Sequence, residues 1–196
     1  MPLFSSARER RLWLWSGAVV VAIYSTLGLA GTLGEVLREY ELLEASSLVL
    51  FAMFLLGATI FTSGIRLRPR GAEVAVLLGL TFVYLLLFLR TTVSPAERTH
   101  LMEYGVLGVF IYEALSERVS QGRRVPVPPV VAVVLTTLLG VADEGIQWLL
   151  PNRVFDPVDM LFNFLAGTTS VAAVVVLAWA RRLASGRRGP PGTPAA

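Results

Sequence analysis

The chain has 196 residues, of which 55% are hydrophobic and 16% charged, with a mean hydropathy of +0.67. Soluble domains carry about a quarter charged residues, so this composition predicts a polytopic membrane protein. The absence of cysteine excludes disulfides, thiolate metal sites and cysteine nucleophiles. Every basic residue is an arginine, and the arginines form short clusters beside apolar runs, which indicates membrane topology and argues against nucleic-acid binding.

Apolar runs predict an all-α bundle of about six transmembrane helices in a single domain over residues 1–180. The first run is too long for a cleaved signal peptide, so we expect a retained signal-anchor helix, followed by a short amphipathic connection over 35–46. Ser94-Pro95 and Asp156-Pro157 are typical of helix starts. The tail, residues 181–196, is rich in arginine, glycine and proline and is expected to be disordered. The runs cover approximately residues 12–33, 47–65, 72–89, 95–115, 127–150 and 158–180.

The distribution of arginines predicts that both termini lie in the cytoplasm. With the N-terminus inside, thirteen arginines fall on the cytoplasmic side and four on the opposite side, a strong positive-inside bias. Trp148 then lies at the outer interface and the other three tryptophans at the inner one, where indole rings prefer to sit. The four outer arginines are Arg38, Arg90, Arg98 and Arg153.

Three of the predicted helices carry polar side chains at membrane depth, where each charge costs roughly 2.5–3.5 kcal/mol. Spacings of three and four place His100 with Glu103, Asp143 with Gln147, and the α-helical stripe from Asp156 to Gly167 each on one helix face, and Glu144 is close beside Asp143 and Gln147. With a rise of about 1.5 Å per residue, the groups lie near one level on the extracytoplasmic side, which predicts a shared site that opens outward. The groups are His100 and Glu103; Asp143, Glu144 and Gln147; and Asp156, Asp159, Asn163 and Gly167, with Arg153 in the preceding turn.

These residues resemble the motifs of the VanZ-like family of membrane proteins, over residues 95–175. That family has a histidine and a following Glu-Tyr near one helix start. It then has an Asp-Glu-x-x-Gln helix end, an arginine turn, a D-x-x-D helix start and an Asn-x-x-x-Gly. The corresponding elements in this chain are His100 with Glu103-Tyr104, Asp143-Glu144 with Gln147, Arg153, Asp156 with Asp159, and Asn163 with Gly167.

The resemblance implies a multi-pass protein of the bacterial cytoplasmic membrane that acts in the cell envelope. It also implies a link to glycopeptide resistance, because the namesake of the family raises tolerance to teicoplanin. It does not define a reaction. The implied catalytic positions are His100, Glu103, Asp143, Glu144 and Asp159, and the implied substrate-binding positions are Gln147, Arg153, Asp156 and Asn163.

Structural explanations compete with functional ones at several of these positions. Asp156 is typical of a helix N-cap, and Asp159 can stabilise the same helix end. Arg153 can pair with Asp156 or with a lipid phosphate, and Asn163 can pack helices together. His100 with Glu103 can be a hydrogen-bonded pair that holds the bundle. Adjacent carboxylates inside a membrane, such as those of Asp143 and Glu144, are too costly for packing alone and favour function.

Three functions fit this pattern. The first is an enzyme acting on an envelope lipid or its headgroup, with His100 as general acid or base and Arg153 binding a phosphate. Its nucleophile would be water, Thr99 or Thr168. The second is a non-catalytic binding or transport module for an amine-bearing ligand, a cation or a proton, favoured by the excess of acidic residues. The third is a structural or interaction protein. A divalent cation held by oxygen ligands is compatible with the first.

Overall fold

The computed structural model describes residues 3–41, 95–150 and 157–186. These residues form four helices: α1 (Ala7–Glu39), α4 (Pro95–Ser120), α5 (Pro128–Leu149) and α6 (Pro157–Gly186). No strand occurs in these three ranges, which agrees with the all-α prediction. The second and third apolar runs fall at 42–94, outside the described residues.

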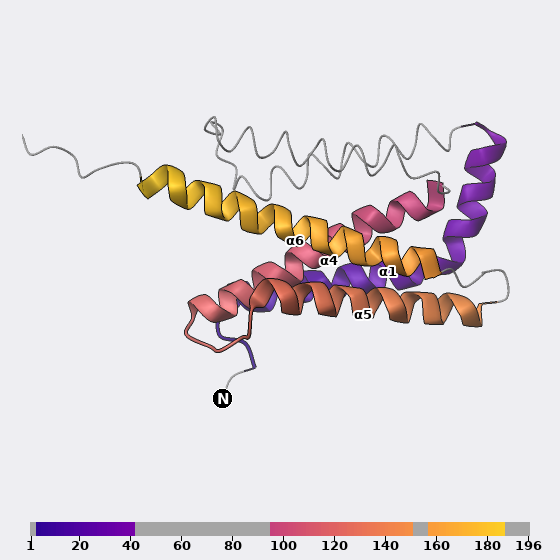
Figure 1. Ribbon diagram of the computed structural model, residues 1–196. Coiled ribbons are helices and arrows are strands. Elements are labelled where there is room, and N and C mark those ends of the chain that lie inside the picture. The colour runs from indigo at the N-terminus through magenta and orange to yellow at the C-terminus, as the bar shows by residue number, and fades with distance from the viewer. Residues whose placement is uncertain (1–2, 42–94, 151–156, 187–196) are drawn as a thin grey trace, which may run out of the picture.

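Helix α4 lies at the centre of the described bundle. It packs against α1, α5 and α6, and α5 also packs against α6, whereas α1 and α5 touch only slightly. Neighbouring helices run in opposite directions, except that α4 and α6 run the same way (Figure 1). The beginning of α1 therefore lies at the same end of the bundle as the end of α4, and the end of α5 lies beside the beginning of α6.

Two of the described helices, α5 and residues 157–180 of α6, are long and apolar enough to cross a membrane. Both carry the hydrophobic side chains that bilayer-spanning segments require, and large residues such as Trp148, Leu161 and Trp179 are exposed on the outside of the bundle. Exposed apolar surface of this kind fits a lipid environment better than water. The described helices are thus compatible with a membrane protein.

The starts of α4 and α6 follow the sequence prediction, but the ends of α1, α4 and α6 lie beyond the predicted apolar runs. Helices α4 and α6 begin at Pro95 and Pro157, where proline lacks only an N–H that a first turn leaves unpaired. The connection expected over 35–46 is partly wrong, because α1 continues to Glu39. The tail expected from residue 181 is also partly wrong, because α6 continues to Gly186. An apolar run marks the bilayer, whereas a helix continues until its backbone is capped or broken.

Small residues allow α4, α5 and α6 to approach closely at the centre of the bundle. A methyl group added at Gly108 would lie 3.3 Å from the Cα of Gly167, and one added at Gly167 would lie 3.0 Å from the Thr136 side chain. Thr136 is fully buried, and its hydroxyl donates to the carbonyl of Ala132. Contacts between small side chains are the usual means of joining helices in membranes.

Candidate functional site

The last two turns of α5 hold a buried acidic group. Asp143 and Glu144 are both 0% exposed, and Gln147 is 2% exposed. The spacing of four between Asp143 and Gln147 puts them on one face of the helix, where they point into the bundle. The Gln147 Nε2 donates to the Glu144 Oε1 at 3.4 Å. The sequence prediction that these side chains lie inside the bundle is therefore confirmed.

Helix α4 contributes a tyrosine and a further acid to this group. The hydroxyl of Tyr104, which is completely buried, donates to the Asp143 Oδ2 at 2.9 Å. The neighbouring carboxyl of Glu103 is largely buried and lies close enough to Asp143 for the two charges to repel each other. The Asp143 carboxylate thus accepts a hydrogen bond from the uncharged Tyr104 hydroxyl, and the Glu103 carboxyl lies near it.

A second tyrosine links α1 to the same place. The hydroxyl of Tyr24 donates to the backbone carbonyl of Leu139 at 2.8 Å, and the Tyr104 hydroxyl lies 3.5 Å from that carbonyl oxygen. Leu139 is one helical turn before Asp143, so both tyrosines fill the layer beneath the acidic group. The ring of Tyr24 packs against the hydrophobic core of the bundle.

Helix α6 brings Asp159 and Asn163 to the same buried face of α5. Asn163 is 0% exposed and lies against Gly140, where a methyl group would be 2.8 Å from the Asn163 Cβ. Because α5 and α6 are antiparallel, this contact places Asp159, which is 8% exposed, about level with Glu144 (Figure 1). Neither Nδ2 nor Oδ1 of Asn163 has a hydrogen-bond partner among the described residues.

Five of the nine predicted site residues therefore line one region between α4, α5 and α6, namely Glu103, Asp143, Glu144, Gln147 and Asp159. Asn163 adjoins this region one helical turn further into the bundle. His100 lies in α4, one turn before Tyr104, and its side chain is outside the described part. Arg153 and Asp156 also lie outside it. The described residues contain no group of three metal-ligating side chains close enough to hold an ion.

Tyr104 is the residue whose role sequence reasoning missed. The family motif contains it, but a tyrosine in an apolar helix gives no sign of its partner, since its ring fits equally well in a core or against lipid. The useful signal was its spacing of four from His100, which places it on the polar face of α4.

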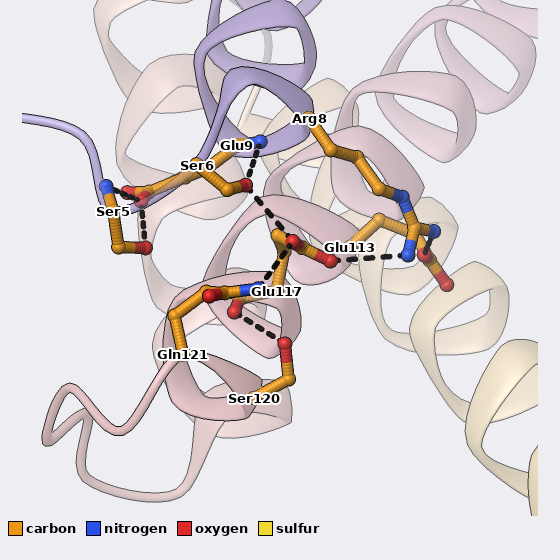
Figure 2. Close-up of polar contacts among 8 residues, drawn as sticks. All are labelled: Ser5, Ser6, Arg8, Glu9, Glu113, Glu117, Ser120 and Gln121. Atoms are coloured by element: carbon orange, nitrogen blue, oxygen red, sulfur yellow. Dashed lines mark hydrogen bonds and ion pairs between the residues drawn. The ribbon is translucent and has the colours of Figure 1, made fainter.

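A second polar cluster lies at the other end of the bundle, where the N-terminal segment crosses the end of α4 (Figure 2). Arg8 forms ion pairs with Glu113 at 2.8 Å and Glu117 at 3.1 Å. The Ser6 hydroxyl donates to Glu117 at 2.9 Å. Arg118 forms an ion pair with the buried Glu9 at 3.1 Å. We call this cluster the N-terminal clasp.

The clasp keeps two glutamates ionised. The hydrogen bond from Ser6 is the main cause that lowers the pKa of Glu117, with further contributions from Gln121 and Arg8. For Glu9, burial opposes ionisation, but hydrogen bonds from the Ser5 hydroxyl and backbone N–H, with the charge of Arg118, outweigh it and lower the pKa. Hydrogen bonds to a carboxylate favour its charged form in this way.

No protein-family model, curated protein or solved structure matches this chain.

Proposed function

We propose that this chain is a VanZ-like, multi-pass protein of the bacterial cytoplasmic membrane, with about six transmembrane helices and both termini in the cytoplasm. We propose further that its acidic cluster, defined as Glu103, Asp143, Glu144 and Asp159, binds the amine-bearing headgroup of an envelope lipid. The family motifs, the apolar runs and the arginine distribution support the first statement. Through the family, the proposal extends to teicoplanin tolerance.

The complete burial of Asp143 and Glu144 is the observation that carries the binding proposal. Two adjacent carboxyl groups inside a bundle of this kind cost several kcal/mol together, at roughly 2.5–3.5 kcal/mol each. A primary ammonium group offers hydrogen-bond donors and a positive charge, which match a pair of carboxylates.

The cluster supports binding more directly than it supports a reaction. Its carboxyl groups could exchange protons with a bound headgroup, but the described part of the cluster holds no serine, threonine or cysteine nucleophile. Of the candidates considered from sequence, Thr168 has a buried hydroxyl that no described residue bonds, and the Thr99 side chain lies outside the described part. Recognition of the amine is the function that the buried carboxyl groups support most directly.

Native mass spectrometry of the purified full chain tests this assignment with phosphatidylethanolamine as the probe and phosphatidylcholine as its quaternary counterpart. We expect Asp143→Asn to weaken phosphatidylethanolamine binding by about ten- to a hundredfold, because a hydrogen bond to a charged group contributes about 1.5–3 kcal/mol. Phosphatidylcholine, whose headgroup has no N–H donor, should bind weakly to both proteins.

Glu39→Gln is the matched control, since Glu39 is an exposed carboxylate at the same end of the bundle but outside the cluster. It should leave phosphatidylethanolamine binding unchanged. If Asp143→Asn binds this lipid as tightly as the wild type does, the acidic cluster is not its site and the assignment fails.

A structural role is the second candidate, and the tyrosine bonds favour it. Tyr104 joins α4 to Asp143 of α5, and Tyr24 joins α1 to the same helix. Tyr104→Phe removes the bond to Asp143 while leaving the charge in place. A structural lock predicts that Tyr104→Phe and Asp143→Asn lower the melting temperature alike without a selective effect on lipid, whereas a binding site predicts selective loss of lipid in Asp143→Asn.

A further inference from the structure

A groove of about 420 Å³ lies between the first turns of α1 and the middle of α4. Arg8, Arg11, Leu12 and Trp15 line it from α1, and Phe110 lines it from α4. The spacing of these α1 residues, three or four apart, places them on one face of the helix. The groove belongs to the end of the bundle that holds the N-terminal clasp, remote from the acidic cluster.

The lining of the groove is almost entirely apolar, and two of its five lining residues are arginines of α1. Arg11 and Trp15 are one helical turn apart, which separates their Cα atoms by about 6 Å along the helix axis. Leu12, Trp15 and Phe110 provide an apolar wall on the side toward the bundle centre, and Trp15 is 60% exposed. A phospholipid has the same order of parts, with a phosphate above an acyl chain.

The two arginines differ in their availability to an anion. Arg8 is bound to Glu113 and Glu117, which compensate its charge and hold it at the mouth of the groove. Arg11 is exposed and forms no ion pair with any described carboxylate. Its positive charge can therefore act on a lipid phosphate.

We propose that this groove binds an anionic phospholipid, with the phosphate at Arg11 and an acyl chain along Leu12, Trp15 and Phe110. The proposal depends on the chain being embedded in a membrane, but not on the function of the acidic cluster. A cluster of basic residues beside an apolar surface is the usual means by which membrane proteins select anionic lipids of the cytoplasmic leaflet.

Titration of the purified full chain with phosphatidylglycerol and phosphatidylcholine, followed by native mass spectrometry, tests the proposal. Wild-type protein should bind phosphatidylglycerol more tightly. Arg11→Gln should weaken that binding by about fivefold, the contribution expected of one arginine near a charged bilayer surface. Arg10→Gln is the matched control, because Arg10 is exposed and adjacent but does not line the groove. It should leave the affinity unchanged.

A second pair of variants tests the apolar part of the groove. Trp15→Ala should weaken both lipids, whereas Leu14→Ala, which removes an exposed side chain from outside the groove, should weaken neither. Soluble glycerol phosphate should not displace the lipid. Equal losses in Arg10→Gln and Arg11→Gln, or equal affinity for the two lipids, would overturn the proposal. Asp143→Asn should retain the preference for phosphatidylglycerol, which separates this site from the acidic cluster.

Discussion

Helices α5 and α6 approach closely at Gly140, where the absence of a side chain leaves room for Asn163. A methyl group there would lie 2.8 Å from the Asn163 Cβ and 3.0 Å from its Nδ2, and both residues are buried. We expect Gly140→Ala to lower the free energy of unfolding by about 1–3 kcal/mol, the usual effect of adding a methyl group to a filled core. Thermal unfolding of the purified protein in detergent measures the change.

Gly145→Ala provides the control for Gly140→Ala. Gly145 lies on the same helix, and a methyl group at that position would meet nothing within 4 Å. Alanine is the better helix former by about 1 kcal/mol, so this variant should be as stable as the wild type or slightly more stable. If the two variants unfold at the same temperature, the close approach of Gly140 and Asn163 does not exist.

The sequence predicts the acidic residues of the site better than their partners. Asp143 and Glu144 were expected inside the bundle, because charges that interrupt an apolar helix are too costly to face lipid. No comparable energy argument identifies Tyr104 or Tyr24, whose rings are stable in either place. The close contact of Asn163 with Gly140 depends on how two helices pack, which helix periodicity alone does not specify.

Among the helices, α1 and α4 are joined by the N-terminal clasp, and this contact should depend on pH. The pKa of Glu117 and that of Glu9 lie below the ordinary value of 4.5, so ionisation of both is favoured in the folded protein. The resulting stabilisation is complete above about pH 4.5 and is lost as the pH falls through the lowered values. We expect the melting temperature to decrease as the pH is lowered through this range.

Glu117→Gln tests the contribution of the clasp to this decrease. It removes the ion pair with Arg8, which is exposed enough to be worth only about 1 kcal/mol. The variant should therefore melt slightly lower at neutral pH and lose less stability on acidification than the wild type does. Glu39→Gln should keep the wild-type pH dependence. An unchanged slope in Glu117→Gln would show that the clasp does not contribute to acid sensitivity.

The starts of α4 and α6 were more predictable than the ends of α1 and α6 for a physical reason. Pro95 and Pro157 can occupy a first turn but not a helix interior, so each marks a boundary in the sequence itself. The ends of α1 and α6 have no such residue, and both helices continue through polar residues such as Arg182 beyond the apolar run. The contacts that form the clasp, which join residues more than a hundred positions apart, were not predictable from local sequence.

At the scale of the whole molecule, the two polar regions lie at opposite ends of the described bundle, and this separation gives a test of orientation. The positive-inside rule predicts that the clasp faces the cytoplasm and the acidic cluster faces outward. Because the chain contains no cysteine, single cysteines introduced at Glu39 and Gln121 report the two ends without interference. Both positions are exposed, Glu39 at the end of α1 and Gln121 just after α4.

A membrane-impermeant maleimide added to intact cells should label Glu39→Cys but not Gln121→Cys. Permeabilised cells should show labelling of both, and detergent-solubilised protein should react equally at the two sites, which controls for thiol reactivity. The reverse pattern would mean that the arginine-rich end faces outward, against the charge bias. Labelling of both positions from outside would show that the two ends of the bundle do not lie on opposite sides of the membrane. In that case α1 and α4 would not cross the bilayer.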